Sequence, residues 1–225
     1  METPQMIIID YNAIAIAGVV TQKMNIDEHL IRHMILNSIR MHVKKHKEQY
    51  GQVVIACDGG SWRRDAFPQY KWSRRNNRKE SKLDFDMIFT TLNKVREEIA
   101  QNMPYKVVYI RNVEADDIIG ALVEQTQEFG QMEDVMIISA DKDFIQLQKY
   151  GNVKQYSPMT KKFIKDDNPN VYLFEHILKG DSSDGIPNVL SGDDTFVEGI
   201  RQSPMTKKKI QSYVDNAENL ESFMG

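Results

Sequence analysis

Cysteine is almost absent from this chain of 225 residues, in which Cys57 is the only one. A single cysteine cannot form an internal disulfide, so a disulfide-stapled fold is excluded and a reducing compartment fits. Cys57 lies in an apolar run, where we expect it to be buried. No apolar run reaches the roughly 18–20 residues that span a bilayer. The N-terminal Met-Glu-Thr-Pro-Gln lacks the basic and apolar stretches of a signal peptide. We therefore expect a cytoplasmic protein that does not associate with membranes.

Several familiar catalytic motifs are also missing. The chain has no Gly-x-x-x-x-Gly-Lys phosphate loop and no serine nucleophile elbow. The pairs His29/His33 and His42/His46 have the i,i+4 spacing of zinc-binding helices, but no cysteine or clear acid completes either set. We expect both pairs to lie on solvated helix faces.

Charge is distributed unevenly along the chain. The net charge is −3, with 41 % apolar and 27 % charged residues, which is ordinary for a globular protein with a core. Residues 62–82 nevertheless carry eight basic and only two acidic side chains. Separate positive and negative regions favour a polyanion on one side and metal cations on the other.

Apolar strands alternate with helical patterns. We expect strands at residues 6–10, 52–58, 106–110, 135–141 and 153–156, and helices at residues 26–47, 86–102 and 114–129. This alternation predicts an α/β fold with a mostly parallel central sheet flanked by helices on both faces. Short helices should follow residue 171, and residues 202–225 should form a separate helical element.

Acidic residues recur where ligands bind in such sheets, at the carboxyl ends of the strands. Three of them end predicted strands, three open a predicted helix, and the others follow in short acidic motifs. Taken singly, each could be a turn or capping residue, or could favour a helix N-terminus. Recurrence at one sheet edge favours a shared site; the nine residues are Asp10, Asp58, Glu114, Asp116, Asp117, Asp141, Asp143, Asp181 and Asp184.

Such a cluster requires cations. Two like charges 4 Å apart repel by on the order of 4 kcal/mol at an effective dielectric constant of 20. Hard divalent ions with oxygen ligands relieve this repulsion. Two ions roughly 3.5–4 Å apart would suit in-line phosphodiester cleavage.

The acidic motifs resemble those of the 5′-nuclease (flap endonuclease) family, most closely its branch of ribonucleases H of T-even bacteriophages. The resemblance spans residues 6 to about 190 and implies a PIN-like α/β fold. The motifs occur in the family's order, and their combination is specific. They are Ile9-Asp10, Ala56-Cys57-Asp58, Glu114-Ala-Asp-Asp117, Ser139-Ala-Asp-Lys-Asp143 and Gly180-Asp-Ser-Ser-Asp-Gly-Ile-Pro187.

The resemblance implies two Mg²⁺ ions, for which Mn²⁺ can substitute. The first metal site would use Asp10, Asp58, Glu114, Asp116 and Asp117, and the second Asp141, Asp143, Asp181 and Asp184. Catalytic roles would fall to Lys71, Arg74, Asp116 and Asp141. Nucleic-acid contacts would come from Arg63, Arg64, Tyr70, Lys71, Arg74, Arg75, Lys207 and Lys208. The aromatic residues Trp62, Phe67, Tyr70 and Trp72 could stack on unpaired bases or pack beneath a basic loop.

The resemblance also implies an organisation and an activity. Residues 1–170 would form the nuclease domain, with a basic arch at about residues 61–85, and residues 171–225 a helical DNA-binding region. Relatives usually continue beyond the position of Gly225, which leaves open whether the chain is truncated there. The activity would be 5′→3′ exonuclease and flap endonuclease, removing RNA primers and adjacent DNA in phage replication. Substrates would be branched or nicked DNA and RNA–DNA duplexes with 5′ ends. A sliding clamp and a single-stranded-DNA-binding protein would be partners of a monomer.

One segment departs from the family pattern. Many relatives have a glycine-rich hairpin that grips the duplex, often with a potassium ion, where this chain has residues 188–196 with one glycine and two acids. Three rival functions remain open: a non-cleaving paralogue that recognises branched DNA, a small PIN-type ribonuclease, and a phosphatase for small molecules. The complete acid set disfavours the first, and the basic stretch disfavours the other two.

Overall fold

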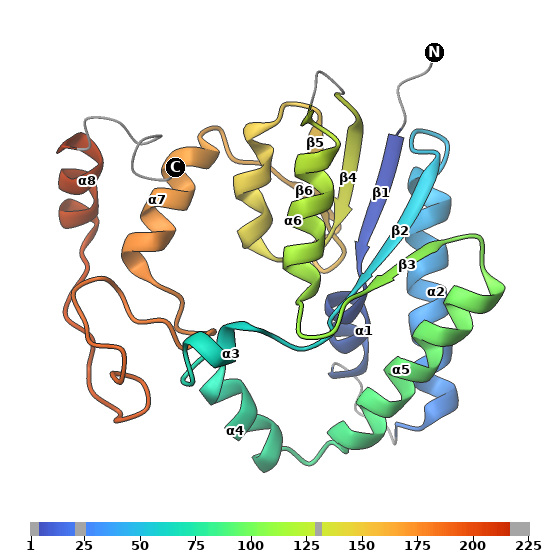
Figure 1. Ribbon diagram of the computed structural model, residues 1–225, viewed down its shortest axis with the longest axis horizontal. Helices are drawn as coiled ribbons and strands as arrows, with labels where there is room; N and C mark the ends of the chain where they lie inside the picture. Colours follow the sequence, from blue (N-terminus) through green and yellow to red (C-terminus); the bar gives the residue numbers. More distant parts are fainter. Residues whose placement is uncertain (1–4, 21–25, 129–131, 217–225) are drawn as a thin grey trace. The chain divides into compact units, whose positions relative to one another are not determined.

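The computed structural model describes residues 5–20, 26–128 and 132–216 (Figure 1). The chain divides into two compact units, and each is described by itself. The first unit comprises Met1–Ser61 and Asp84–Lys165, and the second comprises Trp62–Leu83 and Asp166–Gly225.

A six-stranded sheet forms the centre of the first unit. Its order is β3-β2-β1-β4-β5-β6, with five strands parallel and β6 antiparallel to β5. The expected mostly parallel sheet is thus confirmed, while the short antiparallel strand β6 was not predicted. The strands are β1 (Gln5–Asp10), β2 (Gln52–Cys57), β3 (Lys106–Tyr109), β4 (Asp134–Ile138), β5 (Val153–Ser157) and β6 (Lys162–Ile164).

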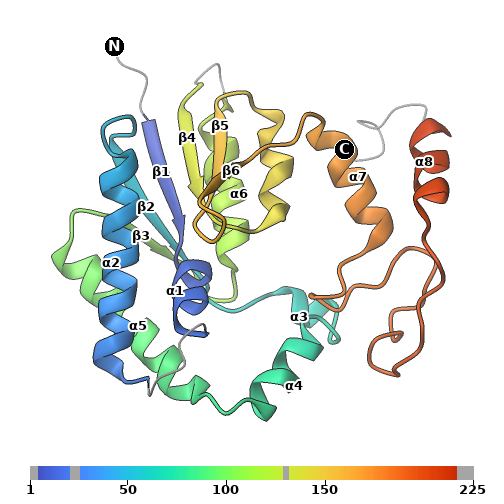
Figure 2. The ribbon, with the colours of Figure 1, turned by 180° about the vertical axis from the view of Figure 1, so that it is seen from behind.

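Helices cover both faces of this sheet. Helix α6 lies in front of the sheet in Figure 1, and α2 lies in front in the reverse view of Figure 2. The core under α6 joins Ile119 and Val123 to Ile8, Val54 and Ile137 of the strands. The helices of this unit are α1 (Tyr11–Val20), α2 (Glu28–His46), α5 (Phe85–Asn102) and α6 (Ala115–Gln125), with a 3₁₀ helix η2 (Lys142–Lys149).

Capping residues define where the long helices begin. The side chain of Asp27 accepts a hydrogen bond from the Leu30 N–H at 2.7 Å, and that of Asp84 accepts one from the Met87 N–H at 2.9 Å. Each carboxylate satisfies a backbone donor that has no partner within its helix. These caps agree with the predicted helix starts to within two residues.

The two histidine pairs of α2 have different environments. His29 and His33 are exposed, as expected, but the expectation was wrong for His42 and His46, which are only 2 % and 4 % exposed. They continue the buried face of α2 and meet the Tyr156 ring edge-on at 5.9 Å and 5.3 Å. Both ring nitrogens of His42 lack a hydrogen-bond partner among the described residues. This burial favours neutral imidazoles.

Acid should therefore remove the stability that the buried neutral histidines contribute to the first unit. Burial, with His46 and Lys45 nearby, lowers the pKa of His42 from 6.5 to about 4, and burial lowers that of His46 too. Because the folded pKa lies below the unfolded one, this stability is complete above pH 6.5 and is lost as the pH falls toward 4. His42 should cost up to about 1.4 kcal/mol per pH unit in that window. Denaturant unfolding from pH 7 to pH 4.5 measures the loss.

A matched pair of variants isolates this effect. Relative to the wild type, His42→Phe should lose less stability between pH 7 and pH 4.5, whereas His33→Phe, at an exposed position of the same helix, should follow the wild-type profile. Identical pH profiles for wild type and His42→Phe would contradict the assignment.

The second unit is helical. Its elements are α3 (Arg63–Ala66), α4 (Trp72–Glu80), α7 (Pro169–Lys179) and α8 (Lys207–Asn216). Phe174 and Leu178 of α7 pack with Ile210 of α8 in a small apolar core. The helical element expected at residues 202–225 appears as α8, and residues 217–225 lie outside the described part. No helix in the described ranges is both long and apolar enough to cross a membrane.

Candidate active site

Three of the expected acids lie at the carboxyl edge of neighbouring strands. Asp10 ends β1, and Asp58 directly follows β2. Strand β4 ends at Ile138, earlier than predicted, and Asp141 follows as the N-cap of η2. Because β2 and β4 flank β1, these loops belong to the same edge of the sheet. It is the edge at which open α/β folds bind ligands.

Asp10 is the most buried of these acids. Its side chain is 5 % exposed and accepts hydrogen bonds from the Ala13 N–H at 3.0 Å and the Ser139 hydroxyl at 2.9 Å. Burial, followed by the charges of Asp58 and Asp141, raises the pKa of Asp10 from 3.8 to about 7. The electrostatic influence of both residues on Asp10 indicates that the three carboxyl groups share one region. A cation there would relieve the cost of ionising Asp10.

The loops after β2 and β3 are held together by close contacts. The Asp58 carboxylate accepts a hydrogen bond from the Ala115 N–H at 2.8 Å, and Glu114 accepts one from the Ser61 hydroxyl at 2.9 Å. A Cβ atom at Gly59 would lie 1.8 Å from the carbonyl oxygen of Ile110, so only glycine fits there. The structure thus brings Asp58 beside the start of α6, whose first turn carries Asp116 and Asp117.

Ser139 connects the remaining acids of this unit. It is fully buried, donates its hydroxyl to Asp10, and accepts a hydrogen bond from the Asp141 N–H at 3.1 Å. Asp141 in turn accepts one from the Asp143 N–H at 3.0 Å. Gln155 of β5 donates its side-chain amide to the Asp141 backbone carbonyl. Sequence reasoning did not assign Ser139 or Gln155, although Ser139 opens the motif that contains Asp141.

Removing the Asp10 charge should stabilise the metal-free protein. Because its folded pKa lies above the unfolded one, the ionised carboxylate costs stability as the pH rises toward and beyond 7. In EDTA at pH 8, Asp10→Asn should raise the free energy of unfolding by on the order of 1–4 kcal/mol. The new amide can donate to the Ser139 hydroxyl while its oxygen still accepts from Ala13.

Denaturant unfolding provides the measurement, and Asp134→Asn at the opposite end of β4 is the control, for which we expect little change. A less stable Asp10→Asn protein would show that the carboxylate is not under strain from burial and like charge.

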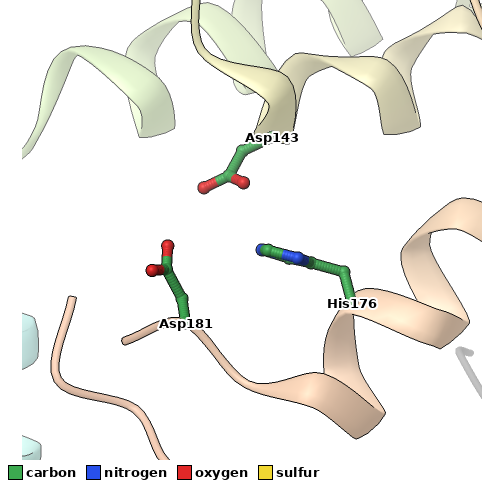
Figure 3. A group of neighbouring side chains, drawn as sticks. All are labelled: Asp143, His176 and Asp181. Carbon is green, nitrogen blue, oxygen red and sulfur yellow. The ribbon is translucent and has the colours of Figure 1, made fainter. Parts of the chain in front are cut away.

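The second unit carries the other two expected acids in the loop after α7. The Asp181 carboxylate accepts hydrogen bonds from the Ser183 N–H at 2.7 Å and the Asp184 N–H at 3.3 Å, so it also acts as a turn residue. His176 of α7 and Asp181 offer ligand atoms within 4.8 Å of each other (Figure 3). Sequence reasoning missed His176, which stacks on Tyr172 one helical turn earlier.

Asp184 pairs with the basic residues of the predicted arch. Its carboxylate lies 2.6 Å from Arg74 Nη2 and 3.7 Å from Lys71 Nζ, and accepts the Tyr70 hydroxyl at 3.1 Å. The Lys71 N–H also donates to the Asp184 backbone carbonyl at 2.7 Å. Burial raises the pKa of Asp184, although Lys71 and Arg74 oppose the rise. The two expected catalytic cations are therefore held by an acid of their own unit.

The other expected nucleic-acid residues differ in exposure. Tyr70 is only 4 % exposed, because its ring is packed and its hydroxyl is bonded, so in this structure it is not open for base stacking. Trp62 is 50 % exposed, with the Arg63 guanidinium 4.8 Å from its ring. Arg75 donates to the Pro68 carbonyl at 2.9 Å. The remaining three, Arg64, Lys207 and Lys208, are exposed.

Comparison with known proteins identifies the family to which this chain belongs. A family model described as "5′-3′ exonuclease, N-terminal resolvase-like domain" matches residues 5–172. Ribonuclease H of Enterobacteria phage T4 is 38 % identical over 94 % of this chain and 72 % of its own length. A 5′-3′ exonuclease of Buchnera aphidicola subsp. Schizaphis graminum is 30 % identical over 76 % of this chain and 58 % of its own length.

A solved structure shares the fold. The bacteriophage T5 D15 flap endonuclease, in a pseudo-enzyme-product complex with DNA and metal ions, superposes with a TM-score of 0.67. It is 19 % identical, and the match covers 96 % of this chain and 86 % of the other. The family match and the T4 relative identify the chain as a nuclease. The chain belongs to the 5′-3′ exonuclease family.

Proposed function

We propose that this chain is a divalent-metal-dependent 5′→3′ exonuclease and flap endonuclease that removes RNA primers and adjacent DNA during phage DNA replication. The proposal rests on the buried Asp10 at the carboxyl edge of the sheet. Burial and the nearby charges of Asp58 and Asp141 raise the pKa of this residue. The family assignment and the phage relative support the proposal. Metal ions and DNA occur in the structure of the T5 relative.

The acidic residues fit Mg²⁺ as the metal. Carboxylate oxygens are the ligands that hard divalent ions prefer. Asp10, Asp58, Glu114, Asp116 and Asp117 would hold one ion, and Asp141, Asp143, Asp181 and Asp184 a second, with Mn²⁺ as a substitute. His176 would suit a softer metal than Mg²⁺, so we keep it out of the ligand set. Bound ions of this kind activate water and stabilise negative charge at a phosphate.

The remaining roles fall to the chain's own residues. Ser139 holds Asp10 and the Asp141 backbone in position through its two hydrogen bonds. Lys71 and Arg74 would exchange the Asp184 carboxylate for the scissile phosphate and stabilise its developing charge. Asp116 and Asp141 would act at the reaction centre. Arg63, Arg64, Arg75, Lys207 and Lys208 would contact the backbone of the nucleic acid.

We further propose a cytoplasmic monomer that acts on branched or nicked DNA and RNA–DNA duplexes with 5′ ends. Sliding-clamp and single-stranded-DNA-binding partners follow from the family resemblance alone, and domain boundaries at residues 170 and 171 remain a prediction.

One assay tests this function. Flap and RNA-primed duplexes with a labelled 5′ end should be cut near that end when Mg²⁺ is present and remain intact in EDTA. Binding without metal-dependent cleavage would favour the non-cleaving paralogue. Cleavage of single-stranded RNA alone would favour a PIN-type ribonuclease. Phosphate release from small esters, with intact nucleic acid, would favour a phosphatase.

A further inference from the structure

Two long stretches of the first unit contain no acidic residue. Residues 29–47 carry five basic residues and residues 144–165 carry five more, without a single Asp or Glu in either stretch. The whole chain has a net charge of −3, so these two stretches are far more basic than the chain as a whole. Neither stretch includes a residue that the proposed function uses.

The fold joins the two stretches on one surface. Lys45 of α2 donates to the Tyr156 hydroxyl of β5 at 2.8 Å, and its Nζ lies 4.0 Å from the centre of that ring. Tyr156 pairs with Phe163 of β6, and their rings meet edge-on at 5.5 Å. The side chains of the C-terminal part of α2 therefore reach β5, and through Tyr156 they adjoin Phe163 of β6.

The basic residues of this surface are exposed and form no ion pair with any acid of the described residues. Among the ion pairs of the described residues, Arg32 pairs with Glu28 and Glu98, and Lys149 with Glu124. No comparable pair within the described part of the chain involves the cations that form what we term the α2–hairpin surface. These are Arg40, Lys44, Lys45, Lys47 and Lys154, all exposed.

The buried groups beneath the surface respond to this positive charge. Burial is the main cause of the low pKa of both His42 and His46; Lys45 adds to it in each case, after His46 for His42. The acid that follows along the chain, Glu48, is itself exposed and makes no ion pair with these cations within the described residues. An uncompensated cluster of this size produces a positive potential that attracts polyanions.

We propose that the α2–hairpin surface binds the phosphate backbone of a nucleic-acid duplex. The inference rests on the proposed nuclease function, which supplies the polyanion, and adds a contact that lies apart from the acidic edge. Helix α2 ends at His46, six residues before Gln52, the first residue of β2, so Lys44 and Lys47 lie toward the amino edge of the sheet.

A duplex fits this surface better than a single strand. Single-strand sites present successive aromatic rings on which bases stack. Among the described residues of α2 and the hairpin, Phe163 is the aromatic side chain that is largely exposed, at 56 %, and the other large exposed apolar side chains are Met41 and Met159. Lysines spaced along a helix and a hairpin suit phosphate contacts, which position a duplex without reading its sequence.

A charge-removal variant tests the proposal. Lys44→Gln, Lys47→Gln and Lys154→Gln are combined in the full chain, and binding of a fluorescent flap duplex is measured in EDTA at several salt concentrations. Each lost phosphate contact should reduce the slope of log K against log[salt] by about 0.9. We expect the slope to fall by about 2–3 and the affinity to fall at least about tenfold at 0.1 M salt.

A charge-matched control carries Lys94→Gln, Lys106→Gln and Lys149→Gln elsewhere on the same unit, and should bind as the wild type does. The thermal midpoints of both variants should match the wild type, since all six side chains are exposed. Unchanged affinity and slope in the first variant would overturn the proposal. The proposal would also be wrong if these substitutions weakened the binding of poly-glutamate but not the binding of the duplex.

Single-turnover cleavage at saturating enzyme separates this surface from the active site. The variant should cut within about twofold of the wild-type rate, because the metal-binding acids are untouched. A wild-type protein that binds the duplex through this surface but never cuts it would contradict the proposed function and leave the surface standing. If the wild type cut the duplex and the variant bound it as tightly as the wild type does, the surface proposal would be wrong and the proposed function would stand.

Discussion

Asp141→Asn should abolish cleavage while leaving nucleic-acid binding intact or stronger. The change removes a negative charge from the acidic edge, where we propose that a divalent ion binds. Loss of several kcal/mol of transition-state stabilisation corresponds to a rate reduced by about 10³ or more. Binding should not suffer, because one fewer carboxylate repels the phosphates. Single-turnover cleavage of a labelled flap duplex and its affinity in EDTA measure the two effects.

The matched control lies at the other end of the same strand. Asp134 begins β4, whereas Asp141 follows its carboxyl end, so Asp134→Asn removes the same charge from the opposite edge. It should cut at the wild-type rate. If Asp141→Asn also cut at nearly that rate, the assignment of the acidic site would be wrong.

Lys71→Ala should lower the single-turnover rate by roughly 10²–10³, the effect of losing one donor to the transition state. In the structure Lys71 Nζ lies 3.7 Å from the Asp184 carboxylate, and the Lys71 side chain is only 15 % exposed. Its ammonium is thus held in place by the protein. The substrate affinity should change far less than the rate, because the proposed contact strengthens as charge develops on the phosphate.

Two further variants separate a specific role from general charge. Lys79→Ala removes an exposed cation of the same basic stretch, from the last turn of α4, and should cut normally. Lys71→Arg should recover part of the rate, since the charge remains while the geometry of its donors differs. A wild-type rate for Lys71→Ala would remove Lys71 from the reaction.

The sheet could be predicted because its strands carry a strong local signal. The segments that became β1, β2 and β4 are continuous apolar runs, as expected of parallel strands buried on both faces. Each is followed closely by an acid, so the carboxyl edge of the sheet could be predicted with the strands. The roles of those acids remain predictions, because they depend on ions and a substrate.

Other features left no such signal. Helix α1 has the sequence Tyr-Asn-Ala-Ile-Ala-Ile-Ala-Gly-Val-Val and is apolar nearly all round, so it has no periodic polar face to recognise. The burial of His42 and His46 depends on Tyr156, more than a hundred residues later. The pairing of Arg74 with Asp184 also joins distant segments. Contacts of this kind are decided by tertiary packing, which local patterns do not encode.

The central position of β1 has a consequence for the order in which the protein matures. Ser139 donates to Asp10 from 129 positions further along the chain, across the boundary between β1 and β4. A ribosome must therefore release the β4 segment before Asp10 can acquire its neighbours. A partly synthesised chain lacks part of the proposed metal site. Ions that bind only the folded protein also stabilise the folded state. Nuclease activity can therefore appear only after β4 has been synthesised and has paired with β1.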